Sequence, residues 1–150
     1  ASANIRWGER FGRFELKLES TPVLTHKYRQ FAGDPGQDRL SLSYQNEWRS
    51  KVGAALNWHL DDWSATVSGI RYGRIPQQDR SVYWHSYALF NTSVAYQVNK
   101  QTSVSLIVNN LTNRFPVDRS AGWPNYPSST YDIYGRQWWV QLDYRFGQKS

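Results

Sequence analysis

The chain has 150 residues, 16% of them aromatic, with a mean hydropathy of −0.72 and a formal net charge of +6 at pH 7. The absence of cysteine excludes a disulfide framework, a thiolate metal site and a cysteine nucleophile. No run of about 18 apolar residues occurs, which excludes a membrane-spanning helix, and the basic residues are scattered without a recognition motif, so nucleic acid is not an expected partner.

The N-terminal residues Ala1, Ser2 and Ala3 resemble the small residues of a signal-peptide cleavage site, but no charged and apolar segments precede them. The chain begins near what the pattern indicates is the end of a strand, around Ile5 and Trp7. We therefore expect the chain to be the C-terminal part of a longer protein.

A period of two between apolar and polar residues recurs along the chain, and it predicts strands with one apolar and one polar face. The first complete strand covers residues 14–19, and Pro22 predicts a bulge or bend beyond it because proline cannot donate to a ladder. Residues 40–44 alternate in the same way and predict a strand extension that stands above a membrane.

The next hairpin is predicted over residues 51–72, with a tight turn at Asp61 and Asp62. Its first strand alternates cleanly. Its second strand does not, because Arg71 shares a face with the apolar residues Trp63, Ala65 and Val67 while Ile70 does not. A bulge near Gly69 is expected to switch the register there.

Two further strands are predicted over residues 88–98 and 102–109, and a last one over residues 135–146. The last strand is about as long as a tilted strand needs to cross a bilayer, roughly 9–11 residues. Its apolar face carries aromatic residues at both ends, which suits the two membrane interfaces. The pattern predicts lipid-facing positions at Val104, Leu106, Val140 and Leu142, and interior positions at Asn109, Gln141 and Asp143.

The predicted connections alternate in length. Residues 8–12, 60–63 and 98–101 are short, whereas residues 32–46, 75–86 and 111–134 are long. Up-and-down outer-membrane barrels sort their connections in this way, and a Greek-key sandwich has no reason to do so. The sequence therefore predicts an all-β, antiparallel, up-and-down transmembrane β-barrel segment, with the turns at Asp61 and Lys100 at one end and the loops around Pro76 and Trp123 at the other.

Motifs near the C-terminus resemble those of a known family. Residues 108–116 read Val-Asn-Asn-Leu-Thr-Asn-Arg-Phe-Pro, which resembles the Val-x-Asn-Leu-Phe-Asn-x-x-Pro segment near the end of TonB-dependent outer-membrane receptors. Residues 131–136 are similar to the Tyr-Asp-x-x-Gly-Arg that opens their final strand. Residues 14–21 and 60–72 resemble earlier hairpins of one large branch. The matching residues in the C-terminal motifs are Asn110, Leu111, Asn113, Pro116, Tyr131, Asp132, Gly135, Arg136 and Phe146.

Two departures from the family pattern occur. Thr112 replaces the usual phenylalanine. A terminal aromatic residue commonly ends such barrels and is read by the assembly machinery, but here residues 147–150 follow Phe146.

The resemblance implies a 22-stranded barrel closed around an N-terminal plug. Residues 1–150 would supply about its last six to seven strands, and the plug and the TonB-contacting segment have no match among them. The implied location is the outer membrane of a Gram-negative bacterium, in contact with lipid and lipopolysaccharide. The implied function is uptake of a small-molecule ligand such as a siderophore, metal chelate or carbohydrate. The implied partners are the plug, the upstream strands and the TonB complex.

The alternative is a complete outer-membrane barrel of about eight strands with a binding or structural role. A soluble lipocalin-like binder is a third hypothesis, but it would need its apolar faces inside the barrel.

No enzymatic activity is predicted. His26, His59 and His85 lack the spacing of metal ligands, and the chain has neither a Gly-x-Ser-x-Gly elbow nor a glycine-rich phosphate loop. We therefore predict no catalytic, cofactor-binding or metal-binding residue. Asn109, Asn110, Asn113, Pro116 and Gly135 are expected to have structural roles in turns and strand ends. Aromatic residues in the long connections are candidates for stacking on a ligand or for anchoring at the membrane interface, namely Tyr83, Trp84, Trp123 and Tyr126.

Overall fold

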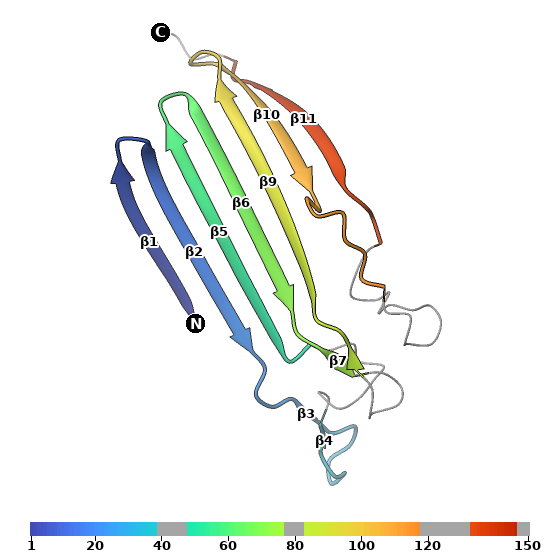
Figure 1. Ribbon diagram of the computed structural model, residues 1–150. Coiled ribbons are helices and arrows are strands. Elements are labelled where there is room, and N and C mark those ends of the chain that lie inside the picture. The colour runs from blue at the N-terminus through green and yellow to red at the C-terminus, as the bar shows by residue number, and fades with distance from the viewer. Residues whose placement is uncertain (39–47, 77–82, 118–132, 147–150) are drawn as a thin grey trace.

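The computed structural model describes residues 1–38, 48–76, 83–117 and 133–146 (Figure 1). A seven-stranded antiparallel sheet dominates it, with its strands side by side in chain order. Its strands are β1 (Ser2–Glu9), β2 (Gly12–Pro22), β5 (Ser50–Leu60), β6 (Trp63–Tyr72), β9 (Tyr87–Gln97), β10 (Thr102–Asn109) and β11 (Gln137–Tyr144). The all-β, up-and-down antiparallel prediction is confirmed.

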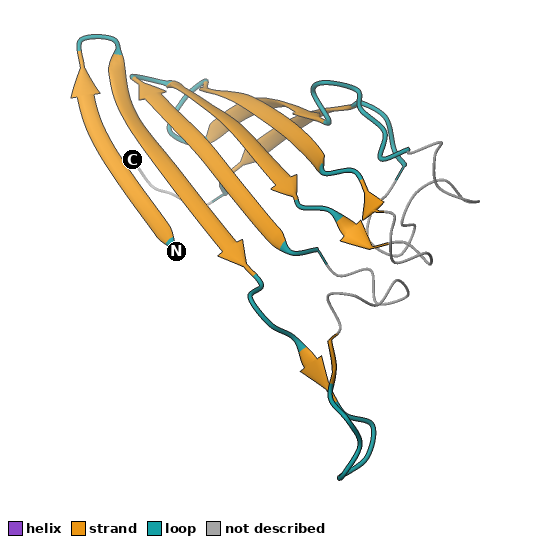
Figure 2. Cartoon of the chain, turned by 60° about the horizontal axis from the view of Figure 1, so that its bottom comes forward, coloured by secondary structure: helices purple, strands orange, loops and turns teal. Residues whose placement is uncertain are grey.

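Two short hairpins lie outside this sheet. One pairs β3 (Lys27–Tyr28) with β4 (Gln37–Asp38), and the other pairs β7 (Ile75–Pro76) with β8 (Tyr83–Trp84). The main sheet is curved, and the β3–β4 hairpin projects from it beyond the end of β2 (Figure 2). No helix in the described part of the chain has the length and apolar character needed to cross a membrane.

The tight connections gather at one end of the sheet, here called the turn end (Figure 1). They join β1 to β2, β5 to β6 and β9 to β10. Asp61 adopts a φ of 49° in the second turn, and the Asn99 carboxamide oxygen accepts the backbone N–H groups of Gln101 and Thr102 in the third.

The long connections leave from the opposite end, here called the loop end. Pro76 lies there as predicted (Figure 1), whereas Trp123 lies outside the described residues.

The ladder registers sort the side chains of the main sheet into two faces, because directly paired residues of neighbouring strands point the same way. One row is apolar across all seven strands and consists of Trp7, Phe14, Trp58, Ala65, Val94, Leu106 and Val140. The adjacent row is mostly polar and consists of Arg6, Glu15, Asn57, Thr66, Ser93, Ile107 and Trp139. We call the face that carries the first row the apolar face, and the face that carries the second row the polar face.

The residues predicted to share a face do so. Val104 pairs with Leu142 and Leu106 with Val140 on the apolar face. Ser103 pairs with Asp143, Ser105 with Gln141 and Asn109 with Gln137 on the polar face.

The apolar face is the more exposed one in the central strands. Val67 is 48% exposed and Leu106 is 42% exposed, whereas the polar-face neighbours Thr66 and Ser68 are half-buried. Side chains crowd together on the concave side of a curved sheet, so the polar face is the inside of the curve. Exposure is therefore inverted relative to a water-soluble sheet, which buries its apolar face.

The predicted bulge near Gly69 is wrong. β6 pairs one-to-one with both β5 and β9 from Trp63 to Tyr72. The Phe90 ring occupies the space beside Gly69, where a Cβ atom would lie 2.8 Å from the ring, so glycine fits this position within a regular strand. Arg71 therefore remains on the apolar face, opposite Val52 and Ala88.

The one-to-one pairing of β2 with β5 also continues to Pro22, which ends β2 without a bulge inside it. The strand predicted over residues 40–44 lies outside the described residues.

Candidate functional site

Aromatic side chains line the apolar face near the turn end. We call them the aromatic belt, formed by Trp7, Phe14, Trp58, Trp63, Tyr96 and Tyr144. Trp7 stacks on Phe14 with ring centroids 5.3 Å apart, and the Trp63 and Tyr96 rings lie 4.7 Å apart. The Trp58 indole N–H donates to the Phe11 carbonyl at 2.7 Å. These side chains have an apolar body and, in Trp and Tyr, a polar group, which is the combination found at membrane–water interfaces.

A second aromatic group lies at the loop end, on the side of the polar face. Ile75 is fully buried and packs with Tyr87, which is 7% exposed. Together with the partly buried residues around them they form the loop-end cluster, which consists of Trp48, Tyr72, Ile75, Trp84, Tyr87 and Leu89. Tyr72 pairs with Tyr87 across the ladder, so both project from the polar face.

Lys51 adds a cation to the loop-end cluster. Its Nζ lies 5.9 Å from the Trp48 ring centroid and 5.6 Å from that of Tyr72, within the range of a cation–π contact. The Trp48 and Tyr72 rings are themselves 6.1 Å apart. Aromatic faces beside a cation suit a ligand that combines a planar or sugar-like apolar surface with negative charge.

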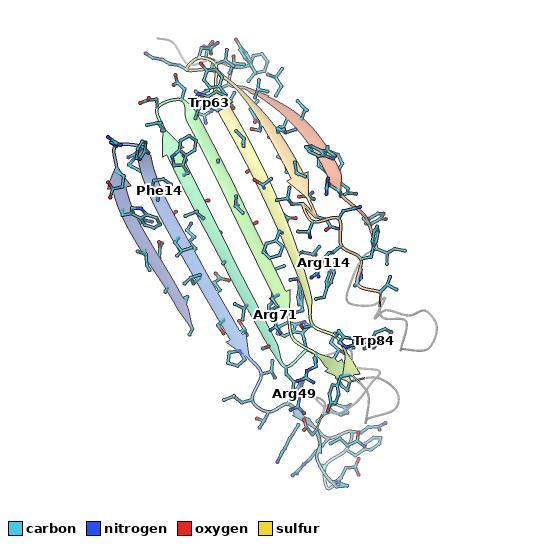
Figure 3. The ribbon with its side chains drawn as sticks, in the orientation of Figure 1. Phe14, Arg49, Trp63, Arg71, Trp84 and Arg114 are labelled. Atoms are coloured by element: carbon cyan, nitrogen blue, oxygen red, sulfur yellow. The ribbon has the colours of Figure 1, made fainter. Side chains whose placement is uncertain are left out.

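The candidate ligand residues are placed only in part. Tyr83 and Trp84 form β8, and Trp84 packs in the loop-end cluster (Figure 3). Trp123 and Tyr126 lie outside the described residues. Trp48, Lys51, Tyr72 and Tyr87 were missed by sequence reasoning. A signal was present for two of them, since Tyr72 and Tyr87 flank the connection between β6 and β9.

Asn110 forms the centre of a hydrogen-bond network at the end of β10. It has a φ of 51° and is 5% exposed. Its side-chain oxygen accepts the Arg114 N–H at 2.9 Å, and its Nδ2 donates to the carbonyl oxygens of Arg114 and Tyr134, at 2.7 and 3.2 Å. Its backbone N–H donates to the Asn91 side chain at 2.9 Å. Asn110 thus links the start of the connection between β10 and β11 to the end of that connection and to β9.

Other motif residues complete this junction. Asn113 also has a φ of 51°, and its side-chain oxygen accepts the Arg136 N–H at 2.9 Å. Gly135 is closely packed, because a Cβ atom there would lie 3.0 Å from that same oxygen. The Leu111 N–H donates to the Phe90 carbonyl at 2.7 Å.

The remaining motif residues contribute less to the junction. Pro116 is buried, and Phe146 is exposed with its ring against Tyr144 at 4.6 Å. Asn109 is the last residue of β10, opposite Gln137, within the strand predicted over residues 102–109. Tyr131 and Asp132 lie outside the described residues.

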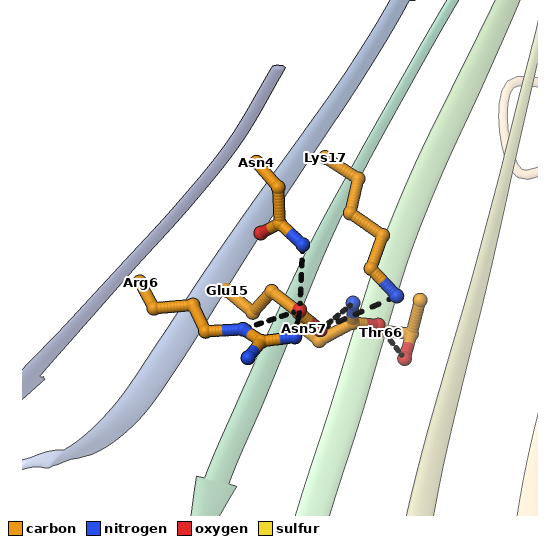
Figure 4. Close-up of polar contacts among 6 residues, drawn as sticks. All are labelled: Asn4, Arg6, Glu15, Lys17, Asn57 and Thr66. Carbon is orange, nitrogen blue, oxygen red and sulfur yellow. Dashed lines mark hydrogen bonds and ion pairs between the residues drawn. The ribbon is translucent and has the colours of Figure 1, made fainter. Parts of the chain in front are cut away.

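Charged and amide side chains on the polar face form a network across four strands (Figure 4). The Glu15 carboxylate lies 2.7 Å from the Arg6 guanidinium and 3.3 Å from the Lys17 ammonium. Asn4 and Asn57 donate to the same carboxylate at 3.1 and 3.4 Å. Thr66 in turn donates to Asn57 at 2.9 Å, so the network runs from β1 to β6.

A shallow groove of about 350 Å³ lies beside this network, bordered by Lys17, Glu19 and Asn91. Small side chains at Gly53, Ala55 and Ser68 leave it open. Among the described residues, no group of three or more His, Asp or Glu side chains could hold a metal ion.

No family model matches the chain, and no solved structure matches it. A function must therefore be inferred from the two faces, the aromatic belt and the loop-end cluster.

Proposed function

We propose that the chain is the C-terminal barrel portion of a TonB-dependent receptor in the outer membrane of a Gram-negative bacterium. The observation that carries this proposal is the inverted exposure of the central strands, with apolar rows on the more exposed face and polar rows on the less exposed one. A surrounding apolar solvent makes that arrangement favourable, because exposing such a face to water forfeits about 25 cal/mol for each Å² of apolar area.

The dimensions of the apolar face support a membrane span. Trp63 of the aromatic belt and Arg71 at the loop end are eight residues apart on β6. At a rise of about 3.3 Å per residue this is about 26 Å along the strand, or about 20 Å along the membrane normal for a strand tilted by about 40°. The apolar band of an outer-membrane barrel is about 25 Å tall.

The unpaired edges of the sheet are an argument for additional strands in the whole protein. β1 and β11 are each eight residues long, and within the described residues each has a ladder on one side only. An unpaired strand edge is costly in a membrane, where water cannot satisfy the backbone groups. Upstream strands that close a larger barrel would satisfy both edges.

The polar face and the loop end supply the transport role in this proposal. The network around Glu15 and the groove beside it would face the plug inside the barrel. The loop-end cluster, with Lys51 beside two aromatic rings, would contact a siderophore, metal chelate or carbohydrate before TonB-driven uptake. The plug and the TonB-contacting segment would come from the rest of the protein.

Lipid contact tests the membrane part of this proposal. The chain has no cysteine, so single cysteines at Val140 and at Gln141 can each be labelled with a fluorophore in the protein purified from its own membrane and placed in vesicles. Brominated lipid tails should quench the label at 140 strongly and the label at 141 weakly, because these neighbours lie on opposite faces. Equal quenching, or a monodisperse protein that needs no detergent, would count against a membrane barrel.

Cross-linking distinguishes a larger barrel from a small barrel that closes directly between β1 and β11, which run in the same direction in this sheet. Val104 and Leu142 are ladder partners, so cysteines at these positions should form a disulfide and serve as the positive control. Cysteines at Ile5 and Val140, or at Trp7 and Leu142, should not cross-link if other strands lie between β1 and β11. Efficient cross-linking of either pair within one chain would favour a small seven-stranded barrel closed by parallel pairing of β1 with β11.

A further inference from the structure

We propose that Arg71 binds a phosphate group of lipopolysaccharide at the outer surface of the membrane. This inference rests on the proposed function and adds to it a specific residue for an anionic lipid. It starts from the register of β6, which leaves a permanently charged side chain on a face that is otherwise built for hydrocarbon.

The distribution of charge over the main sheet singles out Arg71. The charged residues of the polar face are Arg6, Arg13, Glu15, Lys17, Glu19, Lys51 and Asp143. In the same seven strands the apolar face carries only Glu9, beside a turn, and Arg71, near the opposite end. The acid and the cation thus lie at opposite margins of the apolar face.

The surroundings of Arg71 leave its guanidinium available. Its side chain is exposed, and none of the described acidic residues forms an ion pair with it. Its ladder partners are Val52 and Ala88, and the next apolar-face position on its strand is Gly69. These small neighbours allow the aliphatic stem to lie along the sheet while the guanidinium extends to the interface.

The position of Arg71 along β6 determines which part of the bilayer its guanidinium contacts. Tyr72 is the last residue of β6 and belongs to the loop-end cluster, so Arg71 lies at the loop-end margin of the apolar face. An arginine costs about 2–4 kcal/mol at the bilayer midplane but about 0–1 kcal/mol near the interface. At that depth it reaches lipid headgroups, and its planar fork matches the oxygens of a phosphate.

Cations outnumber acids among the described residues at the loop end, where Asp34 and Asp38 accompany Lys27 and Arg29 in the hairpin beyond β2, and the other exposed cations there suit an anionic leaflet. They are Arg49, Arg74, Arg114 and Arg136, and Figure 3 shows Arg49, Arg71 and Arg114 in the part of the sheet away from Phe14 and Trp63. The turn end mixes both signs evenly, with Arg10, Lys100 and Arg145 at the same end as Glu9, Asp61 and Asp62. Long loops mark the extracellular end of an outer-membrane barrel, where the leaflet carries lipopolysaccharide phosphates.

Lipid retention tests the inference. The full-length protein is purified from outer membranes in mild detergent, stripped of lipid, and titrated with bisphosphorylated lipid A while bound lipid is counted by native mass spectrometry. Arg71→Gln should weaken lipid A binding about fivefold, the effect of about one cation at an anionic surface, and Arg71→Lys should weaken it less. Arg13→Gln removes a cation from the polar face and should leave binding unchanged.

The lipid series identifies the chemical source. Dephosphorylated lipid A should bind wild type and Arg71→Gln equally, and phosphatidylglycerol should distinguish them less than bisphosphorylated lipid A does. Heat-modifiable mobility on gels establishes that each variant is folded. If folded Arg71→Gln binds lipid A as wild type does, or if the loss persists with dephosphorylated lipid A, the inference is wrong while the membrane location stands. A wild-type protein absent from the outer membrane would instead overturn the proposed function.

Discussion

The two faces of the main sheet are built from the same strands but suit different surroundings. On the polar face, Glu15 is paired with two cations and two amides, and most side chains in the central strands are half-buried. On the apolar face, Val67, Val94 and Leu106 are more exposed than their polar neighbours. The comparison shows that an alternating pattern defines two faces, whereas the curvature of the sheet decides which of them is outside.

The faces also differ in where their charged residues lie. The polar face holds charged residues along its length, and those near Glu15 form a connected network (Figure 4). The apolar face keeps its charges at its margins, at Glu9 and Arg71. This difference is expected if one face contacts water or polar protein and the other contacts lipid, because the cost of an unpaired charge rises with depth in the bilayer.

The largest effect is expected from a charge in the middle of the apolar face. Val67→Arg should destabilise the protein in lipid vesicles, lowering its free energy of unfolding by about 2–4 kcal/mol, because the side chain lies near the midpoint of β6. Ser68→Arg is the matched control on the polar face and should change it much less. Urea titrations in vesicles measure both, and equal losses would refute the assignment of the faces.

Alanine substitutions at two glycines, one on each face, compare how closely the two faces are packed. Gly69→Ala should destabilise by about 1–3 kcal/mol, because a Cβ atom would lie 2.8 Å from the Phe90 ring. Gly53→Ala, on the polar face, would place its Cβ atom 4.0 Å from the Glu19 Cβ and should be neutral or stabilising by about 0.4–1 kcal/mol. The same titrations apply, and a Gly69→Ala protein as stable as wild type would show that Phe90 moves aside freely.

Two tryptophans test the aromatic belt. Trp58→Phe should cost about 0.5–1.5 kcal/mol, because it removes the hydrogen bond from the indole to the Phe11 carbonyl. Trp63→Phe keeps the ring contact with Tyr96 and should cost less. Thermal melts of the two variants in vesicles should rank in that order, and the reverse order would show that the turn beside Trp58 does not depend on this bond.

The smallest effect is expected on the polar face at Glu15. Glu15→Gln keeps an acceptor for Asn4 and Arg6 but removes the ion pairs with Arg6 and Lys17. Ion pairs with water-exposed partners contribute little because solvent screens them. Stability should therefore change less than in the three comparisons above at both low and high salt. A large loss that persists in high salt would show that the face is shielded from water, because salt screens only those ion pairs that solvent reaches.

Local patterns in the sequence predicted most of the strands, because side-chain alternation is a property of each strand by itself. Residues 51–60 and 102–109 show this clearly, and the turns at Asp61 and Lys100 were placed at the correct end. The failure at Gly69 has a physical reason. Arg71 looked misplaced on an apolar face, but the ring that occupies the space beside Gly69 belongs to Phe90 on the neighbouring strand, a contact that the local pattern does not reveal.

The candidate site was less predictable, because its residues come together only through the ladders. Tyr83 and Trp84 were singled out as loop aromatics, but Trp84 packs with Tyr72 and Tyr87 from two other strands. Lys51 shows no distinguishing feature in the sequence until the register places it beside Trp48 and Tyr72. Contacts between residues distant in the chain depend on which strands pair and in which register.

The sequence by itself determined the all-β class, the two chemically distinct faces and the alternation of short and long connections, because each follows from residues close together in the chain. Only the tertiary structure decided that the sheet curves and that the apolar rows are the more exposed ones in its central strands. It also decided that Asn110 joins residues as distant as Asn91 and Tyr134, and that Arg71 remains at the margin of the apolar face. These features depend on ladder register and curvature, which arise only when all the strands are paired.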